Sequence, residues 1–143
     1  QSPPPNMIRV AQDIGLKKVK FLTAPIVTDE EITSFFNTID ILAHARKDGE
    51  TFGLNIAEAM IHGKPVISHR SHRANAHKPF VKKCGFFVRR DNFRQYAKCI
   101  GILYHNKKKR LTLGRRGHDF ARENFLLTNI GKKLEECYKQ LHT

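Results

Sequence analysis

Two glutamates, Glu50 and Glu58, are separated by seven residues in the segment "DGETFGLNIAEAMIHGKPV", residues 48–66. Acidic residues, glycines and an apolar run occur together here, whereas the chain is otherwise strongly basic. Free amides at a helix start attract phosphate, and carboxylates accept hydrogen bonds from hydroxyl groups. Acidic residues near a helix start are also favoured for structural reasons alone. The spacing therefore leaves two interpretations open, ordinary helix sequence or a ligand site.

The segments that must position these glutamates alternate between strand and helix patterns. Thr28 and Glu31 have the spacing of a capping box, and Gly63 is placed to end a helix. Short connections in a strand–helix–strand order favour a parallel sheet covered by helices. We therefore expect an α/β fold, a Rossmann-like doubly wound parallel sheet with helices on both faces and a helical C-terminal tail. The expected strands are 17–24, 39–45, 64–68 and 85–88, and the expected helices are 7–16, 28–39, 52–63, 91–106, 107–125 and 128–141.

Length and composition favour one folded domain. The 143 residues are 40% hydrophobic, and no apolar run approaches the roughly 20 residues that a membrane-spanning helix needs. The proline-rich opening predicts a linker or a truncated start with a short helix over residues 1–16, followed by one folded domain over residues 17–143. The three cysteines form no paired pattern, so we expect three buried thiols and a reducing compartment.

The positive charge lies almost entirely in the second half. Residues 1–77 contain 9 Lys and Arg against 8 Asp and Glu, whereas residues 78–143 contain 17 against 5. Such a region attracts polyanions, which could be anionic lipid, phosphorylated molecules or nucleic acid. A solvated charged face is the most common structural outcome. Nucleic acid ranks last, because no recognition motif or interleaved aromatic pattern accompanies the charge.

The glutamates fall where α/β sheets usually bind ligands, at the junction between a strand end and a helix start. We expect the helix to begin near Phe52 or Gly53 and its free amides to form an anion site. A glycine at position 53 would let a ligand approach the backbone closely. Glu58, more than one turn into the helix, could accept hydrogen bonds from a diol, while Glu50 would lie on the other side of the phosphates. His44, at the end of the preceding strand, could line this site or be an ordinary core histidine.

The same segment resembles the donor-binding half of the retaining GT-B glycosyltransferases, often called glycosyltransferase family 4. The likeness continues more loosely through "GFFV" and "LGRRGHDFARENF", and so extends over nearly all of the chain from Lys17. The positions that carry it are Asp40, Glu50, Phe52, Gly53, Leu54, Glu58, Ala59, Met60, Gly63, Pro65, Val66 and Ile67.

This resemblance implies a role for each matching position. Glu50 is expected to be the catalytic residue near the donor sugar, and Glu58 to hold the ribose hydroxyls. Ile26 and Val27 lie in the region that frames the nucleotide base. The sugar and diphosphate are expected to contact Thr51, Phe52, Gly53, Leu54, Asn55 and His44.

The resemblance further implies a nucleoside diphosphate sugar as donor and a glycan or lipid-linked hydroxyl acceptor held by an upstream domain that this chain lacks. No metal or other cofactor is expected, and we interpret His69, His72 and His77 as solvated loop histidines. The expected location is cytoplasmic, with peripheral contact to anionic membrane. Two alternatives stay open: a non-catalytic GT-B-like module that binds membrane or nucleic acid through its basic half, and a sugar-nucleotide epimerase of the same fold.

Overall fold

The computed structural model describes residues 5–22 and 25–141. The chain divides into two compact units, Gln1–Ser34 and Phe35–Thr143. The first unit contains helix α1 (Pro5–Asp13), which ends where Gly15 adopts a positive φ of 70°. The amide of Leu16 then donates to the carbonyl of Ala11, so the chain turns back after the helix as predicted.

Helix α2 (Asp29–Thr38) begins in the first unit and ends in the second. Its start confirms the predicted capping box. The Glu31 amide donates to Thr28 Oγ1 at 3.2 Å, and Glu31 Oε2 accepts from the Thr28 amide at 3.1 Å. These reciprocal bonds satisfy two amides that the first turn would otherwise leave free.

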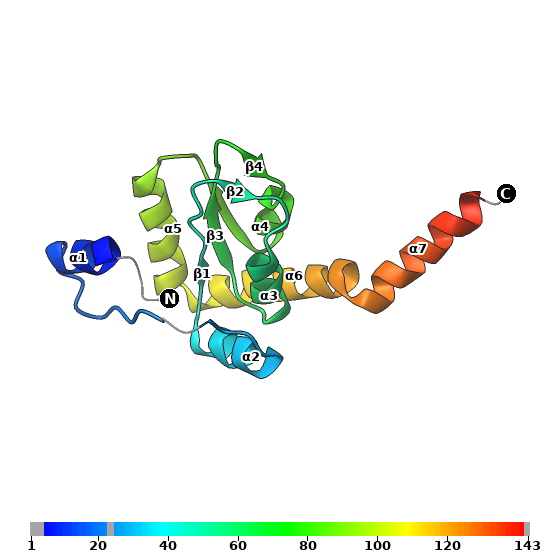
Figure 1. Cartoon of the computed structure of the whole chain (residues 1–143), viewed down its shortest axis with the longest axis horizontal. Coiled ribbons are helices and arrows are strands. Elements are labelled where there is room, and N and C mark those ends of the chain that lie inside the picture. The colour runs from blue at the N-terminus through cyan, green and yellow to red at the C-terminus, as the bar shows by residue number, and fades with distance from the viewer. Residues whose placement is uncertain (1–4, 23–24, 142–143) are drawn as a thin grey trace. The chain divides into compact units, whose positions relative to one another are not determined.

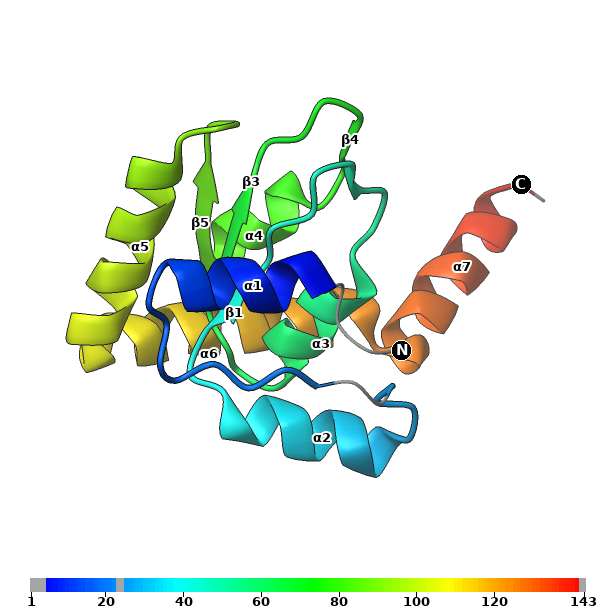
Figure 2. The same cartoon turned by 60° about the vertical axis from the view of Figure 1, so that its left-hand side comes forward.

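The second unit is built on parallel strands. A three-stranded sheet has the order β1 (Leu42–Ala43), β3 (Val66–His69) and β5 (Gly85–Val88), and β2 (Gly49–Glu50) pairs with β4 (Ala74–Asn75). Helix α5 (Phe93–His105) covers one face of the larger sheet, and α3 (Leu54–Ile61) and α4 (Lys78–Cys84) cover the other (Figures 1 and 2). The predicted α/β fold, with a parallel sheet between helices, is therefore confirmed.

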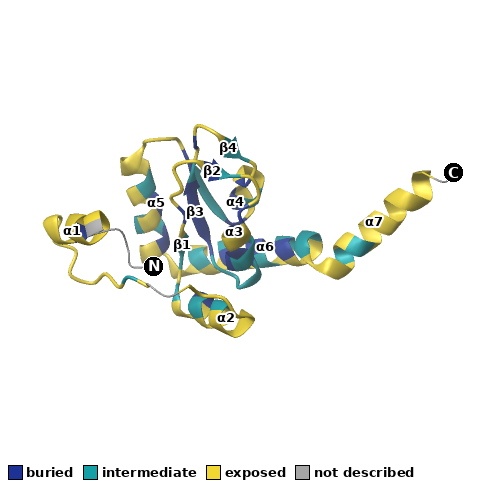
Figure 3. Ribbon diagram, in the orientation of Figure 1, coloured by how far each residue is buried: buried dark blue, intermediate teal, exposed yellow. Residues whose placement is uncertain are grey.

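Continuous burial along β3 shows that both faces of the sheet are covered. Ile67 joins Val88 from β5 and Cys99 and Leu103 from α5 in one buried cluster. Its chain neighbour Ser68 is also buried, on the opposite face, since successive side chains of a strand point to opposite sides. Figure 3 shows β3 as the most continuously buried strand of the molecule.

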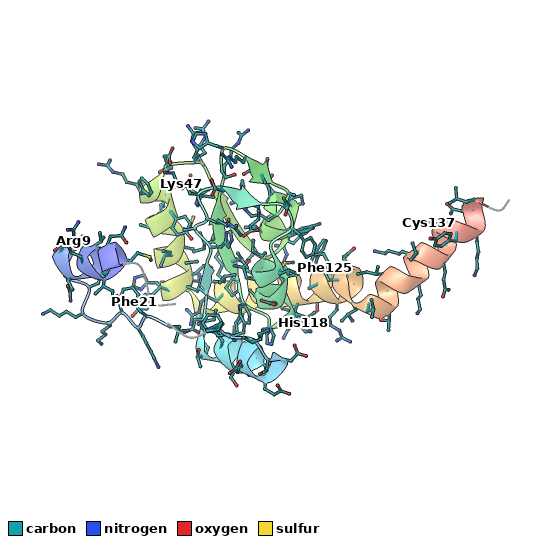
Figure 4. The ribbon with its side chains drawn as sticks, viewed as in Figure 1. Arg9, Phe21, Lys47, His118, Phe125 and Cys137 are labelled. Carbon is teal, nitrogen blue, oxygen red and sulfur yellow. The ribbon has the colours of Figure 1, made fainter. Side chains whose placement is uncertain are left out.

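The long helix α6 (Lys107–Phe125) packs against α3 and α4 through two buried glycines. A Cβ at Gly114 would lie 1.9 Å from the carbonyl oxygen of Gly63, and one at Gly117 would lie 2.5 Å from Cβ of Cys84. His118, marked on α6 in Figure 4, places Nδ1 2.6 Å from the carbonyl oxygen of Ile61 and donates to it. Helix α6 therefore holds the C-terminal end of α3 by direct backbone approach.

Three sequence predictions about elements were wrong. Residues 17–22 form no strand, because the described part of the first unit offers no second strand for their backbone groups, and residues 23–24 lie outside the described residues. Residues 69–84, for which the sequence predicts no strand or helix, contain both β4 and α4. The helix expected from residue 91 begins instead at Phe93, because Asn92 caps it and its Oδ1 accepts from the amide of Gln95 at 2.9 Å.

The chain ends with α7 (Leu127–Leu141), which has no buried residue. Figure 3 shows it almost entirely exposed, beyond the end of α6. Among the described residues, no helix combines the length and apolar character needed to cross a membrane.

Candidate donor-binding site

Glu50 is fixed by strand pairing, although the sequence places it in a loop. It lies in β2 opposite Asn75 of β4, and its carbonyl accepts from the amide of Ala76 at 3.1 Å. The preceding Gly49 has a φ of 78°, and a Cβ there would lie 1.8 Å from the carbonyl oxygen of Ala74. Glycine is therefore required at position 49 for β2 and β4 to approach so closely.

The side chains of Arg46 and His44 hold the carboxylate of Glu50. Its Oε1 accepts from Arg46 Nη1 at 3.0 Å and from His44 Nε2 at 3.2 Å. Burial would raise the pKa of Glu50, but the hydrogen bonds from Arg46 and His44 outweigh it and hold this pKa below its usual value. Within the described part of the chain, Oε2 has no hydrogen-bond partner. Glu50 is therefore ionised near neutral pH with one oxygen available.

His44 is a buried residue of the strand-end region, with 6% of its surface exposed. Its Nε2 faces Glu50, and its Nδ1 lies 3.2 Å from Ser68 Oγ. Both ring nitrogens are thus occupied by protein groups. The geometry gives His44 a role in holding Glu50, and direct contact between His44 and a donor stays a prediction.

Helix α3 begins at Leu54 without a side-chain cap. Gly53, the N-cap residue, has φ 87° and ψ 70°, and its carbonyl accepts from the amides of Ile56 and Ala57. The amides of Leu54 and Asn55 precede these bonds and belong to the first turn, which carries the positive end of the helix dipole. The first turn therefore has no side-chain cap, and anion binding at this helix start stays a prediction.

The Phe52 side chain anchors the loop that enters α3. Its ring lies edge-on to Phe80 of α4 at 5.5 Å and to Phe125 of α6 at 5.3 Å between centroids. Figure 4 marks Phe125 near the end of α6. Thr51, the residue before Phe52, is exposed. The aromatic cluster therefore fixes Phe52, and with it the loop that enters the helix.

Glu58 lies in α3 and is half-buried. In the part of the chain that the structure describes, its carboxylate has no ion-pair or hydrogen-bond partner, and the nearby His62 Nδ1 donates instead to the Glu58 carbonyl at 2.8 Å. A half-buried carboxylate without a protein partner is favourably satisfied by a ligand that donates hydrogen bonds to it.

The expected base-binding residues lie in the other unit. Ile26 and Val27 are exposed and precede α2, with the Val27 amide donating to Glu31 Oε2. Their contact with a nucleotide base stays a prediction.

The loop histidines do not behave alike. His77 is fully buried, so its interpretation as a solvated loop residue was wrong; the ring packs under Phe87 at 5.4 Å between centroids. His72 is exposed and contacts Arg90, and His69 Nδ1 donates to the neighbouring carbonyl of Arg70. No group of three or more His, Cys, Asp or Glu side chains in the described ranges is placed to hold a metal ion.

The three cysteines differ in their exposure to solvent. Cys84 and Cys99 are buried, and burial raises the pKa of Cys84 to about 12. Cys137 on α7 is exposed, which corrects the expectation of three buried thiols (Figure 4).

Sequence reasoning missed Arg46 and Ser68 as parts of this site. Ser68 offered one signal, a polar residue directly after the apolar "PVI" of a predicted strand, near its carboxyl end. Arg46 offered none, because a basic residue in a polar loop usually has no fixed partner.

Residues 6–120 match the model of the family described as glycosyl transferases group 1. The chain belongs to this family. Its fold is also that of solved GT-B enzymes. The chain is similar to the Anabaena protein HepE in complex with UDP, with 24% identity and a TM-score of 0.80, covering 94% of this chain and 36% of HepE. HepE in complex with UDP-glucose gives a TM-score of 0.76 over the same shares.

The chain is also similar to sucrose-phosphate synthase from Thermosynechococcus elongatus, with 22% identity and a TM-score of 0.74, covering 96% of this chain and 34% of the synthase. This group 1 chain thus spans about a third of the length of these solved proteins. No curated protein matches it. At these identities the likeness establishes the fold, and donor, acceptor and activity are matters for proposal.

Proposed function

We propose that this chain is the donor-binding part of a retaining glycosyltransferase of the family 4 type, which moves a hexose from a nucleoside diphosphate sugar to a hydroxyl acceptor. The observation that carries the proposal is the uncapped start of α3 with a carboxylate on either side, Glu50 in β2 and Glu58 in the helix. The family membership of the chain and the UDP and UDP-glucose complexes of HepE support it.

The diphosphate occupies the start of α3 in this proposal. The amides of Leu54 and Asn55 and the helix dipole offset its negative charge, which the leaving nucleoside diphosphate also carries after the sugar–oxygen bond breaks. The positive φ of Gly53, which glycine adopts without strain, turns the chain into the helix and leaves the amides of Leu54 and Asn55 without a side-chain cap. Stabilising the leaving group in this way speeds transfer without requiring a metal ion.

The two carboxylates bind hydroxyl groups at the ends of the donor. Glu58 accepts hydrogen bonds from the ribose diol, and Glu50, through its unpartnered Oε2, accepts from a sugar hydroxyl and orients the anomeric carbon. The acceptor hydroxyl, from a glycan or a lipid-linked saccharide, approaches that carbon from an upstream domain. Binding of a lipid-linked acceptor would bring the protein to a membrane surface on the cytoplasmic side.

Calorimetric titration of the chain with UDP tests the Glu58 assignment. UDP binds more tightly than uridine, because the diphosphate engages α3, and Glu58→Ala weakens UDP binding by about tenfold or more, since hydrogen bonds to charged groups contribute roughly 1.5–3 kcal/mol. The matched control is Glu123→Ala, an exposed glutamate of α6, which leaves UDP binding unchanged.

Two results would contradict the proposal. Salt-sensitive binding of polyanions that is indifferent to Glu58→Ala would favour a basic interaction module. Release of UDP from a nucleotide sugar without an acceptor would favour an epimerase. We further expect that the 143 residues alone transfer no sugar. Measurable transferase activity from them would contradict the proposal that the acceptor is bound by an upstream domain.

A further inference from the structure

Behind Glu50 lies a continuous row of buried polar side chains. His44 Nδ1 is 3.2 Å from Ser68 Oγ, and Ser68 Oγ is 3.0 Å from His77 Nε2. The three residues are 6%, 1% and 0% exposed. They come from three segments, the end of β1, strand β3 and the start of α4, so the fold itself brings them together.

Hydrogen-bonding rules give this row a direction. The Glu50 carboxylate can only accept, so His44 Nε2 carries a proton and a neutral His44 has a bare Nδ1. The Ser68 hydroxyl then donates to His44 Nδ1, and its oxygen accepts from His77 Nε2–H. The row therefore runs from His77 through Ser68 and His44 to Glu50, with each N–H or O–H donating toward the carboxylate.

His77 is the inner end of the row. Its Nδ1 is buried and has no hydrogen-bond partner of normal geometry among the described residues. Burial lowers the pKa of His77, and the nearby carbonyl of Glu50 opposes this shift in smaller measure, so the ring is neutral near pH 7. The other charged or titratable groups around the row are Arg46 beside Glu50 and His69 on β3.

We propose that Ser68 and His77 are positioning residues for Glu50, which hold the His44 ring in the orientation and tautomer that donate Nε2–H to Oε1 and so keep Oε2 directed at the donor sugar. The role of Glu50 toward the sugar rests on the proposed function, whereas the direction of the row rests on the distances, the burial and the hydrogen-bonding rules for neutral imidazole rings. A buried histidine ring is often fixed by a hydrogen bond at its second nitrogen in this way.

The orientation is tested first by nitrogen-15 NMR of the two imidazole rings in the 143-residue chain. Both His44 and His77 are expected as Nε2–H tautomers, with a slowly exchanging His44 Nε2–H signal. Replacing Ser68 by Val removes the hydroxyl and abolishes the slow exchange, whereas Ser68→Thr has the same branched shape with the hydroxyl retained and preserves it. A His77 ring protonated at Nδ1, or a His44 signal indifferent to Ser68→Val, would overturn the proposal.

The functional consequence is tested by comparing UDP-glucose with UDP, since only the former reaches Glu50. Ser68→Val is expected to reduce the binding gained from glucose by about tenfold, as Glu50→Gln does, while Ser68→Thr retains it and UDP binding stays constant in all variants. Should Ser68→Val fail to fold, Ser68→Ala replaces it, because alanine removes the hydroxyl without added bulk.

The two proposals fail differently. If Glu50→Gln leaves UDP-glucose binding unchanged, the assigned role of Glu50 toward the sugar is wrong and the functional part of the inference falls with it. If Glu50→Gln weakens UDP-glucose binding but Ser68→Val and Ser68→Thr behave alike, the positioning role of Ser68 is overturned and the role of Glu50 stands.

Discussion

At the scale of single residues, the buried His77 links the stability of this chain to pH. Because burial lowers its pKa, the folded chain binds a proton at this ring less readily than the unfolded chain does. The stability contributed by a neutral His77 is fully present above the unfolded pKa and is lost as pH falls through and below it. Glu50, whose pKa is also lowered, contributes in the same direction but at more acidic pH.

We therefore predict that the free energy of unfolding decreases as pH falls from about 6.5, the usual histidine pKa, toward 5. His77→Gln retains an N–H donor near the Nε2 position and cannot titrate, so its unfolding free energy is expected to vary less over this interval. Urea denaturation at several pH values measures both proteins. Equal pH dependence in the two proteins would show that His77 does not carry the effect.

Single residues also show what sequence can and cannot predict about the site. Glu50 and Glu58 were found from a local segment, because helix starts and their flanking carboxylates are encoded within a few neighbouring residues. Ser68 and His77 meet His44 only after β1, β3 and α4 have assembled, from positions up to 33 residues apart. Nothing in the polar sequence around His77 indicates burial, so such contacts could not be predicted locally.

At the scale of elements, the close approach of α6 to α3 depends on glycine. Gly114 has no room for a Cβ beside the carbonyl of Gly63, whereas a Cβ added at Gly101, inside α5, would meet open space. Alanine has a higher helix propensity than glycine at both positions. Comparing Gly114→Ala with Gly101→Ala therefore distinguishes the effect of helix packing from the effect of helix propensity.

Gly114→Ala is expected to destabilise the chain by about 1–3 kcal/mol, because a backbone carbonyl cannot move aside without shifting a helix. Gly101→Ala is expected to stabilise it by about 0.5–1 kcal/mol. Thermal and urea denaturation measure both variants. A neutral Gly114→Ala would mean that α6 and α3 separate easily, contrary to the packing described.

Element prediction succeeded where the signal was local. The capping box of α2 and the strand "GFFV" formed as expected, since each is specified by adjacent side chains. The expected strand at 17–24 was wrong over residues 17–22, because a strand also needs a neighbour, which its own sequence does not specify. The sequence did not predict the pairing of β2 with β4, because both segments are polar and the paired residues are 25 positions apart.

At the scale of the whole second unit, α7 is separable from the core. It contains no buried residue, and its described contacts to α6 include the bond from Asn129 Nδ2 to the carbonyl of Arg122 and that from Lys133 Nζ to Asn124 Oδ1. Exposed hydrogen bonds of this kind contribute little to stability. The buried Ala121 and the ring of Phe125, which contacts Phe52, lie just before it.

Truncation after Leu126 is therefore expected to change the unfolding free energy by less than about 1 kcal/mol. Truncation after Phe120 removes Ala121 and Phe125 and is expected to cost about 3 kcal/mol or more, because burying a large aromatic ring contributes that much. Urea denaturation of both truncated chains gives the comparison. A large loss on removing α7 alone would show that its exposed apolar face contributes to the core.

At Gly53, the residue before the uncapped start of α3, a substitution that raises thermal stability is expected to lower ligand affinity. Gly53 provides no capping side chain, and glycine at this position is roughly a few tenths of a kcal/mol less favourable than a capping asparagine. Asparagine is a residue that tolerates the left-handed backbone and could supply the missing cap. The capping oxygen would then occupy the place where a phosphate oxygen is proposed to bind. A search for more heat-resistant variants of this chain would consequently tend to select at position 53 against the phosphate binding proposed for the free helix start.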